Sequence, residues 1–428
     1  MTTLRDLGIK PEQVTLSNGI QLINFRRIGS PLYIKCLFIA GSRFDHIDGI
    51  SHFVEHLLVA GTKKFPTKNV LSSYIENHGG FFNAQTGLET LSINISLGDP
   101  NDIAIASDIL KQIILNPLFN TKTIETERNS ILMEIKNTKT NPSKSLYDSF
   151  ISLAFKNTPL GHSILGSENS VKEITRKDIL TFYNTNILNG QIILSSSGDI
   201  SIQKIEKYFS WLNKLNYIKT LNTHISTITP KQKISITKSL QSDFIHLIYG
   251  FKTPSVFPKN NDASLSLIIQ ALAGSRSSIL MNELRYKNGL VYNINTMTNY
   301  LSNSGLWAIK TSTEIKNLPK VIDLINLQFS NISKKGLTNS ELELTKNRII
   351  KSARLFLQTS ASIVDFHTYR QFFNNNSLWT IEDYLKKIIE TSVSSTKTTF
   401  NKYIDSNNLF LAIYGGIDKK KIPPLWTN

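Results

Sequence analysis

The residues whose types and spacing could do chemistry together lie between Gly49 and Val59, a stretch that contains His52, Glu55 and His56. In a helix each residue turns by about 100°, so these three side chains would share one narrow face. Two histidines four residues apart can bind one metal ion, and a carboxylate beside the second can reach a water on that metal. Because zinc lowers the pKa of such a water and a glutamate can take its proton, the pattern predicts a zinc hydrolase.

A plainer interpretation of the same stretch is a helix that packs through Phe53 and Leu57 and carries two surface histidines. The order His-x-x-Glu-His is the reverse of the commoner His-Glu-x-x-His and is a recognised metal-binding pattern of its own. Further motifs elsewhere in the sequence are needed to choose between a metal site and a helix with surface histidines.

A second group of acids lies in residues 122–138, which we expect to form a helix. Ile124, Ile131 and Ile135 would make its buried stripe, and Glu127 and Glu134, seven residues apart, would line one edge of that stripe. A carboxylate at the border of a buried face is partly desolvated and is stabilised by a cation such as zinc. Taken alone, however, the two glutamates would be interpreted as solvated.

These patterns occur in a familiar order. The sequence resembles the pitrilysin/insulinase superfamily of zinc peptidases, the inverzincins, and most of all the short two-domain branch that includes the mitochondrial processing peptidase and its bacterial relatives. The resemblance implies that His52, His56 and Glu134 bind one zinc ion per chain, that Glu55 is the general base, and that Glu127 supports a ligand histidine. The separation 134 − 56 = 78 residues is close to the usual spacing in the family.

Residues 79–86 carry a third landmark, Gly-Gly-x-x-Asn-Ala-x-Thr. This segment is similar to the edge strand with which the family binds substrate as an added strand. The resemblance therefore implies that Asn83 and Ala84 contact the substrate. Without the resemblance, they would be an ordinary strand start.

The fourth landmark is residues 284–292, Leu-Arg-Tyr-Lys-Asn-Gly-Leu-Val-Tyr. It is similar to a family segment whose arginine and final tyrosine contact the substrate and stabilise the developing oxyanion. The resemblance assigns these roles to Arg285 and Tyr292. On its own, the segment would hold a salt-bridging arginine and a half-buried tyrosine at the start of a strand.

The elements that must position these residues follow from periodicity and turn signals. Asn18-Gly19 between alternating apolar residues indicates a hairpin over 13–28. The polar stretch 213–233 predicts a linker, and the second half repeats the outline of the first. We therefore expect a zinc-binding peptidase domain at 1–212 and a related domain with the Arg/Tyr segment at 234–428. The resemblance implies an α+β fold, with each domain an antiparallel sheet that has helices packed on one side. The other expected strands are 33–39, the second part of 81–97, 191–199, 234–250 and 408–416. The expected helices are 67–77, 101–115, one from 263 to a break at 274–275, another from there to 287, and 316–333, 339–357 and 379–390.

Composition limits the class of protein. The chain has 428 residues, 40% of them hydrophobic and 19% charged, as is typical of globular proteins. No apolar run could cross a bilayer, and the N-terminus lacks a signal core or transit pattern. The single cysteine, Cys36, suits a reducing compartment, so a cytoplasmic location is expected. The net charge of +16 lacks a compact basic block with aromatics and matches a general richness in Lys, Asn and Ile. We expect no nucleic-acid or membrane partner.

The function expected from all four landmarks is that of a zinc endopeptidase acting on peptides or unfolded segments. A two-domain chain would provide half of the chamber that the four-domain relatives enclose, so the resemblance implies a dimer. A homodimer is the simplest form and a heterodimer with a sister subunit stays open, as does whether Arg285 and Tyr292 act within their own chain or across the dimer. The alternative function is a non-catalytic scaffold subunit, which predicts an eroded metal pattern, whereas the pattern here is intact.

Overall fold

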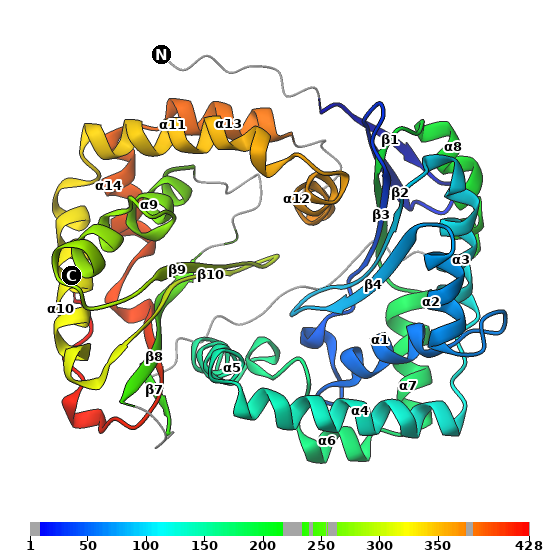
Figure 1. Ribbon diagram of the computed structural model, residues 1–428, viewed down its shortest axis with the longest axis horizontal. Helices are drawn as coiled ribbons and strands as arrows, with labels where there is room; N and C mark the ends of the chain where they lie inside the picture. Colours follow the sequence, from blue (N-terminus) through cyan, green and yellow to red (C-terminus); the bar gives the residue numbers. More distant parts are fainter. Residues whose placement is uncertain are drawn as a thin grey trace.

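Two β-sheets with helices packed against them make up the molecule (Figure 1). The computed structural model describes residues 9–216, 233–238, 243–253, 255, 263–373 and 380–427. Most of the predicted linker, residues 217–232, lies outside the described residues. Among the helices that are described, none is both long and apolar enough to span a bilayer.

The first sheet has six strands in the order β1-β2-β6-β3-β5-β4. The Asn18-Gly19 hairpin is confirmed, with Gly19 at a φ of 95°, a value that glycine adopts without strain. Cys36 is fully buried in β3, as expected of a small apolar side chain. The six strands are β1 (Pro11–Thr15), β2 (Gln21–Arg26), β3 (Leu32–Phe38), β4 (Gly80–Thr86), β5 (Leu91–Leu97) and β6 (Ile192–Gly198).

Helices from the first half cover the outer face of this sheet, where their apolar sides form one core with the strands. The helix expected over 122–138 is confirmed, and its stripe of Ile124, Ile131 and Ile135 is buried. The helices are α1 (Ile50–Ala60), α2 (Lys68–Glu76), α3 (Ile103–Leu115), α4 (Thr121–Thr140), α5 (Pro142–Ala154), α6 (Glu168–Glu173), α7 (Arg176–Phe182), a π-helical turn (Tyr183–Leu188) and α8 (Ile202–Phe209).

The second sheet has five strands in the order β7-β11-β8-β10-β9. Its strands are β7 (Ile234–Thr237), β8 (Phe244–Thr253), β9 (Ile294–Tyr300), β10 (Gly305–Glu314) and β11 (Leu409–Tyr414). The helices of this half are α9 (Ala263–Ala273), a π-helical segment (Met281–Lys287), α10 (Leu318–Lys335), α11 (Asn339–Phe356), α12 (Ser360–Phe373), α13 (Ile381–Glu390) and α14 (Val393–Tyr403).

The mixed α and β fold class is confirmed, with two differences in detail. Each sheet contains one parallel pair, β2 with β6 and β7 with β11, among otherwise antiparallel strands. Each sheet also receives a helix on its other face from the opposite half of the chain. Helix α5 packs on β8 and β11, and α12 packs on β3 and β6, so both helices lie between the two sheets (Figure 1).

A buried ionic cluster adds a polar contact between the halves. Arg43 and Glu89 come from the first half, and their guanidinium and carboxylate form an ion pair with side-chain exposures of 4% and 1%. The Tyr369 hydroxyl donates to Glu89 Oε2 at 2.7 Å, and the Ser302 backbone N–H donates to the same oxygen at 2.7 Å. Because Glu89 accepts from both halves, the cluster fixes their relative position with groups that are costly to separate.

Candidate metal centre

The start of α1 is fixed by its surroundings, and this sets where its polar face points. Gly49 precedes the helix at a φ of 90°, and a Cβ there would lie 2.8 Å from the Leu165 carbonyl oxygen. The Asp45 carboxylate accepts from the backbone N–H groups of Gly49 and Ser51 at 2.9 and 3.2 Å, which is favourable at a helix N-terminus. The apolar face of α1, formed by Phe53, Val54, Leu57 and Leu58, is completely buried.

On the opposite face, His52 and His56 meet Glu134 of α4. Glu134 Oε2 lies 3.7 Å from His52 Nε2 and 3.9 Å from His56 Nε2, and the three potential ligand atoms all lie within 4.8 Å of one another. Neighbouring ligand atoms around a tetrahedral zinc ion are about 3.3 Å apart, so a small contraction would complete the coordination. Two imidazoles and one carboxylate, with a fourth position left for water, are a donor set that suits catalytic zinc.

Glu127 lies on α4 about two helical turns before Glu134 and contacts the second ring nitrogen of His56. Its Oε2 lies 2.9 Å from His56 Nδ1. A carboxylate in this position fixes the ring so that Nε2 faces the ligand cluster. Helix α4 is held against α1 by Arg128, whose guanidinium lies 5.1 Å from the Phe53 ring and donates to the Ile174 carbonyl at 2.9 Å.

Glu55 lines the same cavity as the three candidate ligands, but its carboxylate is hydrogen-bonded to a residue of β4. Its Oε2 accepts from the Thr86 hydroxyl at 2.8 Å. Burial raises the pKa of Glu55, and the Thr86 hydrogen bond opposes that rise. Burial, with a smaller contribution from His56, lowers the pKa of His52 to about 3, which keeps the imidazole in the neutral form that binds metals.

The cavity around these residues has a volume of about 640 Å³. Several of the residues that line it had no role that the sequence alone could indicate. Thr86 is the last residue of the Gly-Gly-x-x-Asn-Ala-x-Thr motif, and its position in that motif could have indicated a role at the site. Tyr147 on α5 and Lys310 on β10 carried no local signal, because only the packing of their elements against the first half brings them to the cavity.

The predicted substrate-contact residues on β4 lie close to this cavity. Ala84 lines it together with Gln85 and Thr86, whereas Asn83 is exposed on the same strand and does not line it. The strand order places β4 at the edge of the first sheet, where its outer backbone groups face away from β5. This is the geometry that an added peptide strand requires.

The predicted Arg285 and Tyr292 are not brought to the metal cavity within one chain. Neither residue lines it, and Tyr292 is 76% exposed. The Arg285 guanidinium lies 4.7 Å from the centre of the Tyr292 ring, so the two side chains stay together at another surface. The strand expected to start at the end of this segment begins at Ile294.

Comparison with known proteins agrees with the metal centre. Residues 32–168, which contain both histidines and Glu134, match the family model "Insulinase (Peptidase family M16)", and residues 173–349 match "Peptidase M16 inactive domain". The chain is 25% identical to a mitochondrial-processing peptidase subunit beta of Lentinula edodes, over 98% of this chain and 93% of that one. It is 28% identical to an uncharacterized zinc protease of Rickettsia felis, over 80% and 82% of the two chains.

The fold of this chain is also similar to that of a solved structure. A crystal structure described as a peptidase M16 inactive domain from Pseudomonas fluorescens aligns with a TM-score of 0.87 at 20% identity, over 97% of this chain and all of that chain. Both halves of the sequence match models of one family, and the relatives align over most of the chain. The chain belongs to the insulinase family of peptidases, peptidase family M16.

Proposed function

We propose that this protein is a zinc-dependent endopeptidase that hydrolyses peptides or unfolded polypeptide segments inside a dimeric chamber. The observation that carries the proposal is the convergence of His52, His56 and Glu134 from two helices, with the Glu55 carboxylate in the same cavity. Zinc bound by the three ligands would supply Lewis-acid chemistry to the scissile carbonyl and to the attacking water.

The chain's own residues do the remaining work. Glu55 takes the proton of the attacking water at its carboxylate and later passes it to the leaving amine. The Thr86 hydroxyl, 2.8 Å from Glu55 Oε2, holds that carboxylate in one orientation. Glu127 holds the ring of His56 through Nδ1.

The substrate would lie extended along β4. Its backbone would pair with the free edge of that strand near Asn83 and Ala84, so that affinity comes from main-chain hydrogen bonds. Such pairing requires an unfolded segment, because a folded substrate has no free strand to offer.

We further propose a homodimer in which Arg285 and Tyr292 of the partner subunit stabilise the tetrahedral intermediate. The exposure of Tyr292 and its absence from the described cavity lining of its own chain support this arrangement. We propose the cytoplasm as the location, because a single buried cysteine suits a reducing compartment.

Glu55→Gln tests the mechanism. The purified protein should hold about one zinc ion per chain and cleave an unstructured peptide. The variant should keep the zinc and lose activity by about 10²- to 10⁴-fold, because only the proton acceptor is removed. Full activity with zinc retained would refute the role of Glu55. A wild-type protein that binds no zinc and cleaves no peptide would favour the scaffold subunit instead.

A mixing experiment tests the dimer. Chains with Glu55→Gln are unfolded and refolded together with chains that carry Tyr292→Phe, each inactive by itself. If Tyr292 acts across the dimer, the mixed dimer contains one site with both residues intact, and activity returns. If Tyr292 acts within its own chain, every site keeps one defect and no activity returns. Each variant refolded alone is the control.

A further inference from the structure

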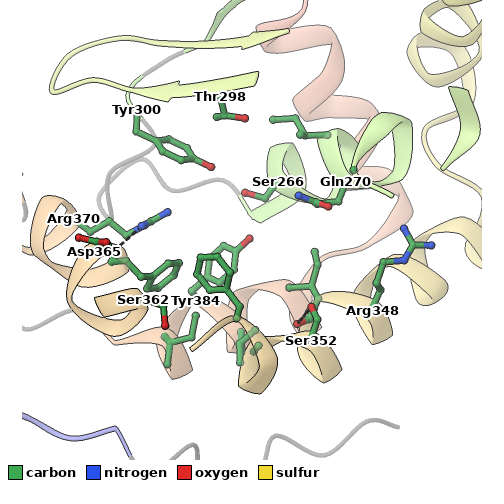
Figure 2. Close-up of a pocket in the computed structure, with 18 residues that line it drawn as sticks. Ser266, Gln270, Thr298, Tyr300, Arg348, Ser352, Ser362, Asp365, Arg370 and Tyr384 are labelled. Carbon is green, nitrogen blue, oxygen red and sulfur yellow. Dashed lines mark hydrogen bonds between the residues drawn. The ribbon is translucent and has the colours of Figure 1, made fainter. Parts of the chain in front are cut away.

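A second cavity, of about 850 Å³, lies in the other half of the molecule and shares none of the described lining residues of the metal cavity. Its walls come from α9, β9, α11, α12 and α13 (Figure 2). We propose that it binds a short peptide with a free C-terminal carboxylate, which is anchored by Arg348.

The charges of the lining favour an anion. Arg348 and Arg370 lie at opposite ends of the cavity (Figure 2), and Asp365 is the one acid among the described lining residues. Asp365 is already neutralised, because Lys35 Nζ donates to its Oδ1 at 2.7 Å. The described lining therefore carries an excess of positive charge.

Arg348 has one donor nitrogen for which the described residues offer no acceptor, and a turn of the side chain would present it to an anion in the cavity. Its Nη2 donates to the Ser277 hydroxyl at 3.0 Å, whereas its Nη1 is buried and has no hydrogen-bond partner among the described residues. A buried guanidinium nitrogen without an acceptor is unfavourable, and a carboxylate is the acceptor whose geometry matches it best.

Arg370, in contrast, is held by contacts with neighbouring side chains and backbone. It donates to the Phe366 carbonyl at 2.6 Å, and its guanidinium lies 5.2 Å from the Tyr300 ring and 4.0 Å from the Phe366 ring. These contacts hold its charge at the far end of the cavity. We therefore assign the carboxylate to Arg348 and a general electrostatic contribution to Arg370.

The remaining walls suit a peptide better than a small inorganic anion. Ile269, Ile349 and Leu385 provide apolar surface for side chains. Ser266 and Gln270 provide hydroxyl and amide groups that can pair with peptide N–H and C=O groups. A free phosphate would leave the apolar walls in contact with water, and a simple acyl chain would leave the polar groups without partners. The choice of a peptide rests on the proposed hydrolysis, which generates such carboxylates, whereas the need for an anion does not.

Calorimetry with full-length, zinc-loaded protein carrying Glu55→Gln tests the proposal, since the probe is then not degraded. The probes are acetyl-leucyl-phenylalanine with a free carboxylate and the same peptide as its C-terminal amide. The acid should bind at least about tenfold more tightly than the amide, because only the carboxylate forms an ion pair with the guanidinium. Hydrogen exchange should slow in α11 and α13 on binding, and not in β4, where a peptide at the metal cavity would pair.

Three further variants on that background locate the binding. Arg348→Gln should abolish the preference for the acid, and Arg348→Lys should keep part of it, because the charge remains. Lys351→Gln is the matched control: it removes the same charge from an exposed position of the same helix outside the cavity and should change nothing.

Equal binding of acid and amide would overturn the proposal, and so would equal effects of Arg348→Gln and Lys351→Gln. Exchange protection confined to β4 would place the peptide at the metal cavity instead, which also overturns it. Displacement of the peptide by inorganic phosphate at equal concentration would refute the peptide assignment. A protein that discriminates acid from amide as expected but never cleaves peptides would refute the proposed hydrolysis and leave this site standing.

Discussion

Replacing Glu127 tests whether the residue behind the metal ligands matters as the geometry indicates. Its carboxylate lies 2.9 Å from His56 Nδ1, and the two side chains are only 17% and 21% exposed. A hydrogen bond to a charged group in such a place contributes about 1.5–3 kcal/mol. Gln keeps the size and an accepting oxygen but loses the charge, so Glu127→Gln should give up about half of that contribution.

The expected result is a fall in zinc affinity of about tenfold for Glu127→Gln and up to about a hundredfold for Glu127→Ala. The measurement is competition for zinc against a chromophoric chelator at fixed pH. Activity at saturating zinc should fall less than affinity, because Glu127 does not touch the substrate.

Glu125→Gln is the matched control. It removes the same charge from the same helix two residues away, where Glu125 is exposed and pairs with Arg128 rather than with a histidine. An affinity for Glu127→Gln within a factor of two of the wild type would refute the reasoning. So would an equal loss in both variants, since that would reflect net charge and not the contact with His56.

Three more predictions follow from other contacts. Thr86→Val removes the donor to Glu55 and should lower kcat about tenfold with zinc content unchanged, measured by peptide cleavage and metal analysis. Glu89→Ala removes the carboxylate from the buried Arg43 and should destabilise the fold by about 3–5 kcal/mol in urea unfolding. Burial lowers the pKa of His367 to about 4, so between pH 6.5 and 4 the unfolded chain takes up a proton that the folded chain does not. Stability should therefore fall by up to about 3 kcal/mol as the pH drops through this range, and His367→Leu should remove that part of the pH dependence.

Each of these has a clear contrary result. Loss of zinc from Thr86→Val would mean that the hydroxyl supports the metal site and not the base. Unchanged urea midpoints for Glu89→Ala would show that the ionic cluster does not hold the halves together. The same acid sensitivity in His367→Leu as in the wild type would assign that sensitivity to other groups.

The local elements of the site could be predicted because their information is local. The period of a helix places His52, Glu55 and His56 on one face whatever the rest of the chain does. The same period placed Glu127 and Glu134 on one edge of a stripe of isoleucines, and that stripe is buried. The Asn-Gly hairpin is equally local, because glycine adopts the required φ without strain.

Helix α12 could not be predicted from the periodicity of its apolar residues. Its residues, Ser360–Phe373, were not predicted as a helix, and their apolar, aromatic and polar side chains do not form one clear stripe. The reason is that α12 packs on β3 and β6 of the opposite half and also lines the second cavity. A helix with contacts on several sides has no single apolar face for periodicity to detect.

The sequence by itself determined which residues could bind a metal and which element would carry each one. Only the tertiary structure decided that Glu134 reaches the two imidazoles across 78 residues of chain, that Thr86 holds Glu55, and that Arg285 and Tyr292 lie away from the cavity of their own chain. The physical reason is that periodicity fixes the direction of a side chain within its own element. The distance between two elements depends instead on how their buried faces pack, which no single stretch of sequence encodes.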